Sequence, residues 1–306
     1  MSDSTPSAAS ADPLSDLGFE LKKRRRWPFI VAGIVVVVAI AAAIILPKVF
    51  VVASPNDTPG ATLLVATAEG NAAEEALVNF VAEKIAPKYG IKVAFTGLSD
   101  SNTINRGVSD GEIAATVYQH KLWLSQVLQA NPDFREEAAT PVFRWGFGLW
   151  SAKYKTPAEI PIGGVVSLYS DPANEAQGLW ILSDAGLITL KEGTGKGTAT
   201  QDDIATNPKK LEFKLLDFAA QSRALNDLDA AVGYTEYYLA ANIPISQQIF
   251  APAAPDEFAG QLTIGSRYAN SYNIKQLIKA FQDPAVQEFL ASDPTVKGIL
   301  LPLAAQ

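Results

Sequence analysis

The pattern of hydrophobic and polar positions separates a short N-terminal region from a long globular one. Residues 29–46 form an uninterrupted non-polar run. As a helix, this run would rise about 27 Å, close to the roughly 30 Å hydrocarbon core of a bilayer. Five basic residues at positions 22–26 precede it and should stay on the cytoplasmic side. We therefore predict a disordered cytoplasmic tail over residues 1–26, a single-pass anchor in the cell membrane over residues 27–50, a linker over residues 51–60 and an extracytoplasmic domain over residues 61–306.

A cleaved signal peptide is the alternative for this N-terminal region. The segment Val51-Val52-Ala53, before Ser54, has the small-residue spacing of a cleavage site. A signal peptide usually has an apolar segment of about 7–15 residues behind a short charged region, and both parts are longer here. An uncleaved anchor therefore fits the pattern better. Either interpretation places residues 61–306 outside the membrane.

After residue 60 the chain alternates short apolar runs with amphipathic helical segments. Leu77, Phe80, Val81 and Ile85 share one face at helical spacing, whereas residues 91–95 alternate as in a strand. This alternation is typical of α/β units on a largely parallel sheet, and two groups of such units predict two lobes with a cleft. The connectivity stays open. The predicted strands are residues 62–67, 91–95, 113–118, 164–169, 211–216 and 230–233, and the helices after residue 100 are residues 103–108, 174–185, 222–228, 274–281 and 284–291.

Composition argues against several classes of function. The chain has no cysteine and one histidine, so it lacks the side chains that form most transition-metal sites. The first 26 residues carry +1 of the net charge of −7, and the acidic remainder argues against a broad nucleic-acid surface. No Gly-x-Ser-x-Gly motif occurs, and Gly197 after Lys196 breaks the spacing of a phosphate loop. We therefore predict neither enzymatic activity nor a cofactor.

The segment Tyr118-Gln119-His120-Lys121-Leu122-Trp123 is the strongest candidate for binding chemistry. It places the single histidine of the chain among aromatic side chains at the end of a predicted strand. This combination favours the wall of a ligand pocket. A purely structural histidine is the alternative.

The same segment resembles Phe-Gln-His-Lys-Pro-Tyr of the NlpA/MetQ-type methionine-binding lipoproteins, the substrate-binding receptors of ABC importers. Further similarities occur in the same order between residues 63 and 298. They are Ser99-Asp100 with Asn105, Ser170-Asp171-Pro172-Ala173-Asn174, residues 186–191, residues 203–211, Ala220-Gln221, residues 225–229 and Val296-Lys297-Gly298. The family's lipid-bearing cysteine is absent, so the predicted helix would replace the lipid as anchor.

The resemblance implies a fold, a function and partners. The fold would be an α/β, two-lobed periplasmic-binding-protein-like (type II) fold after an N-terminal transmembrane helix. The chain would bind methionine or a related amino-acid-like solute and deliver it to an ABC permease with its ATPase subunit. Tyr118, His120 and Trp123 would surround the apolar part of the solute. Asn174 would either cap a helix or contact the solute.

The head-group positions depart from the family pattern. Gln177 stands where the family has an arginine that binds the ligand carboxylate, and a neutral amide cannot replace that cationic fork. Tyr234 and Glu236 fall in the polar Asn-Thr-Asn-Tyr segment, where Glu236 would repel a carboxylate and favour an amine. Gln261 matches an amide in the last strand that crosses between the lobes. Arg144 could supply a relocated carboxylate contact or a cation–π partner, or could pack along a tryptophan.

Three interpretations of function therefore stay open. The chain could bind methionine or a close relative, or a different amine-bearing or neutral solute. It could also be an anchored sensor or interaction protein that kept the receptor fold without transport.

Overall fold

The computed structural model describes residues 54–253 and 255–303, which belong to one compact unit. The predicted tail, the predicted anchor and the cleavage site before Ser54 fall on residues 1–53, outside the described residues. Among the described residues, no helix has both the length and the apolar character needed to span a bilayer.

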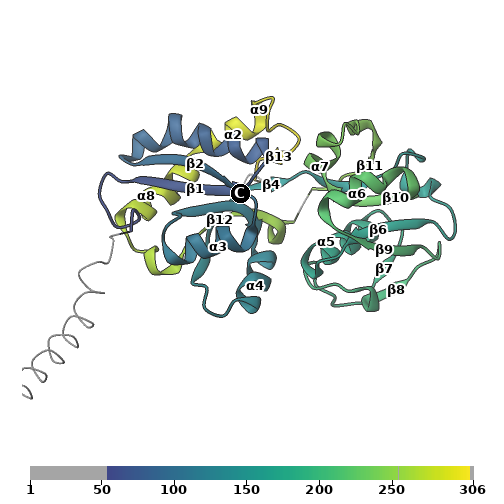
Figure 1. Cartoon of the computed structure of the whole chain (residues 1–306). Coiled ribbons are helices and arrows are strands. Elements are labelled where there is room, and N and C mark those ends of the chain that lie inside the picture. Colours follow the sequence, from purple (N-terminus) through teal and green to yellow (C-terminus); the bar gives the residue numbers. More distant parts are fainter. Residues whose placement is uncertain (1–53, 254, 304–306) are drawn as a thin grey trace, which may run out of the picture. The chain divides into compact units, whose positions relative to one another are not determined.

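The first lobe is built on a six-stranded sheet in the order β13-β4-β12-β3-β1-β2 (Figure 1). Strand β1 runs parallel to β2 and β3, whereas β12 runs antiparallel to β3 and β4. Helices α2 and α9 cover one face of this sheet, and α3 and α4 lie on the other. The strands are β1 (Thr62–Ala68), β2 (Lys92–Leu98), β3 (Ala115–His120), β4 (Glu136–Trp145), β12 (Ala259–Gly265) and β13 (Leu300–Leu301). The α-helices are α2 (Ala72–Phe80), α3 (Ser101–Asp110), α4 (Lys121–Ala130), α8 (Tyr272–Phe281) and α9 (Pro284–Ser292).

The second lobe is built on a five-stranded sheet in the order β11-β5-β10-β6-β9. Strand β6 runs parallel to β9 and β10, and helices α5 and α6 pack against β6 and β10. The strands are β5 (Phe147–Trp150), β6 (Val165–Tyr169), β9 (Glu212–Leu216), β10 (Ala230–Tyr234) and β11 (Gln248–Phe250), with a hairpin of β7 (Thr189–Leu190) and β8 (Ile204–Thr206). The α-helices are α5 (Pro172–Asp184), α6 (Phe218–Ala224) and α7 (Thr235–Ala240).

The chain crosses between the lobes twice, between β4 and β5 and between β11 and β12. Gly146 is the single residue between β4 and β5. Its amide donates to the carbonyl oxygen of Ile299, and its carbonyl accepts from the amide of Thr235. A Cβ atom at this position would lie 2.5 Å from the carbonyl oxygen of Gly298 and 2.7 Å from Thr235 Oγ1. The crossing therefore needs glycine, because backbone from both lobes closes around it.

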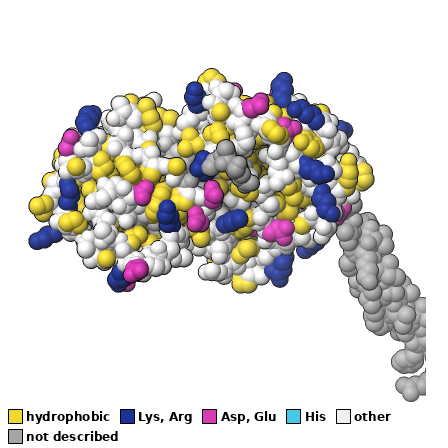
Figure 2. Space-filling view, turned by 180° about the vertical axis from the view of Figure 1, so that it is seen from behind, with side chains coloured by type: hydrophobic (Ala, Val, Ile, Leu, Met, Phe, Trp, Pro, Cys, Tyr) yellow, Lys and Arg dark blue, Asp and Glu magenta, His cyan; other side chains and the backbone are white. Residues whose placement is uncertain are grey.

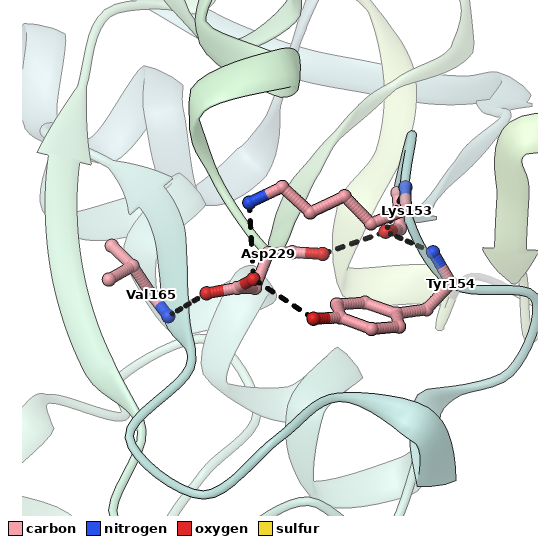
Figure 3. A network of polar contacts seen from close by, with 5 residues as sticks. Lys153, Tyr154, Val165 and Asp229 are labelled. Atoms are coloured by element: carbon pink, nitrogen blue, oxygen red, sulfur yellow. Dashed lines mark hydrogen bonds and ion pairs between the residues drawn. The ribbon is translucent and has the colours of Figure 1, made fainter.

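Asp229, immediately before β10, connects β6 with the segment that follows β5 (Figure 3). Its carboxylate accepts from the Val165 amide at 2.8 Å, from Lys153 Nζ at 3.2 Å and from the Tyr154 hydroxyl at 3.3 Å. Its carbonyl oxygen accepts from Ser151 Oγ at 2.7 Å. Burial alone would raise the pKa of Asp229, but these hydrogen bonds and the Lys153 charge hold it below its ordinary value.

The helices of both lobes begin where strands end, and this places their first turns around the cleft. Polar side chains accept from backbone amides at these helix starts: Asn71 caps α2, Asp100 caps α3, His120 caps α4 and Asp171 caps α5. In open α/β sheets, ligands bind outside the carboxyl ends of the strands. The caps therefore lie at the edge where a ligand is expected.

The predicted alternation of strands and helices is confirmed in both lobes, but several elements were not predicted, among them β5, β11 and α7. Strands β4 and β12 were not predicted, because each pairs with residues far away in the sequence. Helix α4 was missed because His120 ends β3 and caps α4 at once, so no linker separates the two. Residues 54–60, which belong to the predicted linker, pack on the first lobe. Asn56 is buried, and Asn273 Nδ2 donates to two carbonyl oxygens of this segment.

Candidate functional site

A pocket of about 450 Å³ lies between the two lobes, and side chains from both of them line it. On the first lobe its contributors are the ends of β1, β2 and β3, the starts of α2, α3 and α4, and Trp145 at the end of β4. On the second lobe they are the starts of α5, α6 and α7 and the end of β10. All of these are strand ends or first turns, so the topology of the two sheets builds the pocket.

Aromatic side chains form most of the apolar wall of the pocket. The Trp145 ring of the first lobe lies 5.8 Å from the Tyr234 ring of the second in an edge-to-face arrangement. Trp123 and Phe218 meet across the lobes in the same way, with centroids 6.1 Å apart. The remaining aromatic lining residues are Tyr118 and Tyr237. Such rings supply a large apolar surface in a defined geometry.

His120 serves as a helix cap and lines the pocket at the same time. Its Nδ1 accepts from the Trp123 amide at 3.2 Å, so the proton of the neutral ring lies on Nε2. That nitrogen lies 3.3 Å from Asn174 Oδ1 and can donate to it. Burial lowers the pKa of His120 to about 4, although the Asn174 contact opposes this shift. The ring is therefore neutral at physiological pH and brings no positive charge to the pocket.

Asn174 connects the two lobes rather than capping α5. The cap is Asp171, whose carboxylate accepts from both the backbone amide and the side-chain Nδ2 of Asn174. The Asn174 Oδ1 accepts from the Tyr234 hydroxyl at 2.5 Å and lies next to His120. Asn174 lines the pocket, yet every polar atom of its side chain already has a protein partner. Its capping role, predicted from the sequence, belongs to Asp171.

Three of the sequence-predicted site residues do not line the pocket. Gln177 is buried behind Tyr234, with its Oε1 3.0 Å from the Tyr234 hydroxyl. Gln261 is buried in β12 and donates to the carbonyl oxygen of Ala259. Arg144 donates from its guanidinium group to the carbonyl oxygen of Pro302, at 3.2 Å from Nε and 2.8 Å from Nη2. Successive residues of a strand face opposite sides of the sheet, and here Trp145 faces the pocket. A contact between Arg144 and a ligand carboxylate is therefore not supported.

The other six predicted residues, Tyr118, His120, Trp123, Asn174, Tyr234 and Glu236, do line the pocket. The sequence reasoning missed Asn71 and Glu74 at the start of α2 and Trp145 at the end of β4. One local signal was available for the first two. A polar residue that caps a helix just after a first strand lies at the ligand-binding edge of an α/β sheet.

Three acidic side chains line the pocket: Asp100 and Glu74 of the first lobe and Glu236 of the second. Glu74 Oε1 accepts from Trp145 Nε1 at 3.2 Å, and its buried Oε2 has no hydrogen-bond partner among the described residues. Glu236 Oε2 accepts from Asn71 Nδ2 at 2.9 Å. Burial and then the nearby Glu236 charge raise the pKa of Glu74 well above its ordinary value, while the Trp145 hydrogen bond opposes the shift. Burial raises the pKa of Glu236 to about 7, against the Asn71 hydrogen bond.

A buried amide relay extends from the pocket into the first lobe. Gln119 Nε2 donates to Asn105 Oδ1 at 2.9 Å, and Asn105 Nδ2 donates to the Tyr118 hydroxyl at 2.6 Å. The buried Gln119 Oε1 has no hydrogen-bond partner among the described residues. Burial raises the pKa of Tyr118, so its hydroxyl stays protonated. The relay fixes the Tyr118 ring and leaves an acceptor oxygen, Gln119 Oε1, on a residue that lines the pocket.

The α/β fold and the enclosed pocket between two lobes are those of the periplasmic substrate-binding proteins of ABC transporters. The chain aligns with such a protein from Coxiella burnetii at a TM-score of 0.69 and 30% identity, covering 79% of this chain and 100% of that one. The chain belongs to the NlpA lipoprotein family, whose model matches residues 63–303. This is a family of solute-binding proteins rather than of enzymes.

Curated relatives and a further solved structure agree with this assignment. Lipoprotein 28 of Escherichia coli K12 is 33% identical over 220 residues, which cover 71% of this chain and 80% of that protein. The D-methionine-binding lipoprotein MetQ of the same organism is 29% identical over 212 residues, covering 68% and 78%. A nutrient-binding protein from Burkholderia cenocepacia, solved bound to methionine, aligns at a TM-score of 0.66 and 30% identity, covering 78% of this chain and 98% of that one.

Proposed function

We propose that the chain is the extracytoplasmic substrate-binding component of an ABC importer for methionine or a related small amino-acid-like solute. One observation carries the proposal: an aromatic pocket of about 450 Å³ lies between two lobes and is lined from both. A pocket of this size and lining suits a small solute with an apolar body. The names of the relatives, several of which bind methionine, support the same class of ligand.

The proposal includes a permease and its ATPase subunit as partners and the predicted N-terminal helix as the membrane anchor. The type II assignment of the fold is also part of it, supported by two α/β lobes that the chain joins twice. The basic residues before the apolar run support a cytoplasmic N-terminus.

Figure 2 shows basic and acidic side chains interspersed over the face opposite to Figure 1, without a broad surface of either sign.

A thermal-shift screen with amino acids, methionine derivatives and small amines tests the proposal. A ligand at 100 times its dissociation constant adds about 2.7 kcal/mol to the free energy of unfolding. For a domain of this size, the melting temperature should rise by roughly 5–10 °C. Deletion of the gene should also abolish uptake of the same solute. Binding without any uptake defect would contradict transport and favour a sensor.

A further inference from the structure

We infer that this pocket takes an organic cation: a primary ammonium group on an apolar body, without the free carboxylate of an amino acid. The inference rests on the proposed function and narrows its ligand class. It is carried by the Glu74 carboxylate, whose buried Oε2 has no hydrogen-bond partner among the described residues, inside a pocket with aromatic walls.

The pocket offers a carboxyl group from each lobe to a ligand cation. Glu74 is 2% exposed and comes from α2 of the first lobe, whereas Glu236 comes from α7 of the second. An ammonium group between them has three N–H donors for Glu74 Oε2, for the Glu236 carboxylate and for the unpartnered Gln119 Oε1. Two nearby carboxylates repel each other in a buried site, and a bound cation removes that repulsion.

The described lining of the pocket offers no cationic group to a ligand carboxylate, and its unpartnered buried donor, Trp123 Nε1, is neutral. The lining residues include neither lysine nor arginine, and His120 is neutral. Four of the helix starts at the pocket hold their own caps: Asn71 on α2, His120 on α4 and the anions Asp100 and Asp171 on α3 and α5. Helices α6 and α7 have no side-chain cap, but they are short, with 7 and 6 residues. A zwitterionic amino acid would gain from its ammonium group, but it would bring its carboxylate next to the acidic pair without compensation.

Aromatic faces add to the preference for a cation. Trp145 is the exception, because the indole N–H that it donates to Glu74 turns the edge of its ring toward that carboxylate. Tyr234 and Tyr237 line the pocket next to Glu236 in the sequence and in space. A cation against such rings is attracted by their quadrupoles, by about 0.5–2 kcal/mol for each favourable contact. A carboxylate against the same faces is repelled.

Four matched probes test the inference by titration calorimetry on the full chain in a mild detergent at pH 7.5. They are methioninol and 3-(methylthio)propylamine, which are cations, methionine, which is a zwitterion, and N-acetylmethionine, which is an anion. We expect both cations to bind at least about tenfold more tightly than methionine, and the anion to bind most weakly. Methionine binding as tightly as the cations, or more tightly, would overturn the inference while the proposed function stands. Failure of all four to bind would overturn both.

Charge-neutral variants show whether the carboxylates cause the discrimination. Glu236→Gln keeps an oxygen that accepts from Asn71 and should reduce affinity for the two cations at least about tenfold, and affinity for methionine by less. Glu74→Gln, which can still accept from Trp145, should act in the same direction. Glu75→Gln is the control, since Glu75 is exposed on the same helix turn and outside the pocket. Unchanged discrimination in both pocket variants would contradict the assigned cation site.

Discussion

Asn71 Nδ2 of the first lobe donates to Glu236 Oε2 of the second lobe over 2.9 Å, between residues 165 positions apart. Asn71 also caps α2 through its Oδ1, which accepts from the Glu74 amide at 3.1 Å. One side chain therefore positions the start of the helix that carries Glu74 and holds the opposite carboxylate. The lobe contact and the charge of the pocket are coupled through this residue.

Substitution of Asn71 should change how the lobes associate. Asn71→Ser keeps a good helix cap, but the serine side chain is too short to reach Glu236. Asn71→Asp also keeps the cap, and it places a second carboxylate against that of Glu236. We expect a larger radius of gyration in small-angle X-ray scattering without ligand, with the Asp variant more expanded than the Ser variant. Equal, unchanged radii would show that this hydrogen bond does not hold the lobes together. Circular dichroism at 222 nm serves as the control for helix α2.

The stability of the protein should depend on pH through Glu236. Because the folded-state pKa of about 7 is above the unfolded value, the folded protein holds the proton more tightly. Its contribution to the free energy of unfolding is complete below about pH 4.5 and is lost as the pH rises through about 7. The pKa of the Glu74 carboxyl is raised as well. Asp100 and His120 also line the pocket, and both are present in the wild type and in the Glu236→Gln variant. Urea unfolding of the wild type and of Glu236→Gln at pH 5 and pH 8 measures this, and an equal difference at both pH values would contradict it.

Binding of a cation should release protons below about pH 7.5. The bound cation lowers the raised pKa of Glu236 and Glu74, so its affinity should increase from pH 5.5 to pH 8, where the amine is still protonated. Calorimetry in two buffers of different ionisation enthalpy counts the protons released. A pH-independent affinity together with no proton release would show that the pair is already ionised in the free protein.

Gly146→Ala should destabilise the crossing between the lobes. The added Cβ would meet the Gly298 carbonyl at 2.5 Å, and backbone cannot move aside as a flexible side chain can. We expect a loss of about 1–3 kcal/mol in the free energy of unfolding. Gly97→Ala in β2 is the matched control, since its Cβ would make ordinary contacts, none closer than 3.4 Å. Equal effects of the two substitutions in urea unfolding would contradict this account.

Gln177→Arg should destabilise the protein rather than restore methionine binding. Gln177 is 1% exposed and lies behind Tyr234, so an arginine there would bury a charge outside the pocket. We expect a loss of at least about 2 kcal/mol in the free energy of unfolding, with no gain in methionine affinity. Gln177→Met is the matched control, because it keeps the volume without the charge. A tighter methionine complex with unchanged stability would mean that the arginine reaches the pocket after all.

Local patterns in the sequence determined the α/β alternation and the family. Strand and helix signals depend on residues a few positions apart, so the predicted strands of residues 62–67 and 164–169 agree with β1 and β6. The single histidine at a strand end led directly to the pocket wall. The residues before Phe29 and the apolar run itself still support a membrane anchor as a prediction from sequence alone.

Only the tertiary structure decided which side chains meet. Arg144 and Trp145 are adjacent in the sequence, yet strand geometry sends Trp145 to the pocket and Arg144 to the carbonyl of Pro302. Glu74 and Glu236 belong to different lobes and come together because the chain crosses between the sheets and returns. Their carboxyl groups act on each other electrostatically although they lie far apart along the chain. The sequence therefore determined the units of this protein, and the packing of the two lobes decided the chemistry of the pocket.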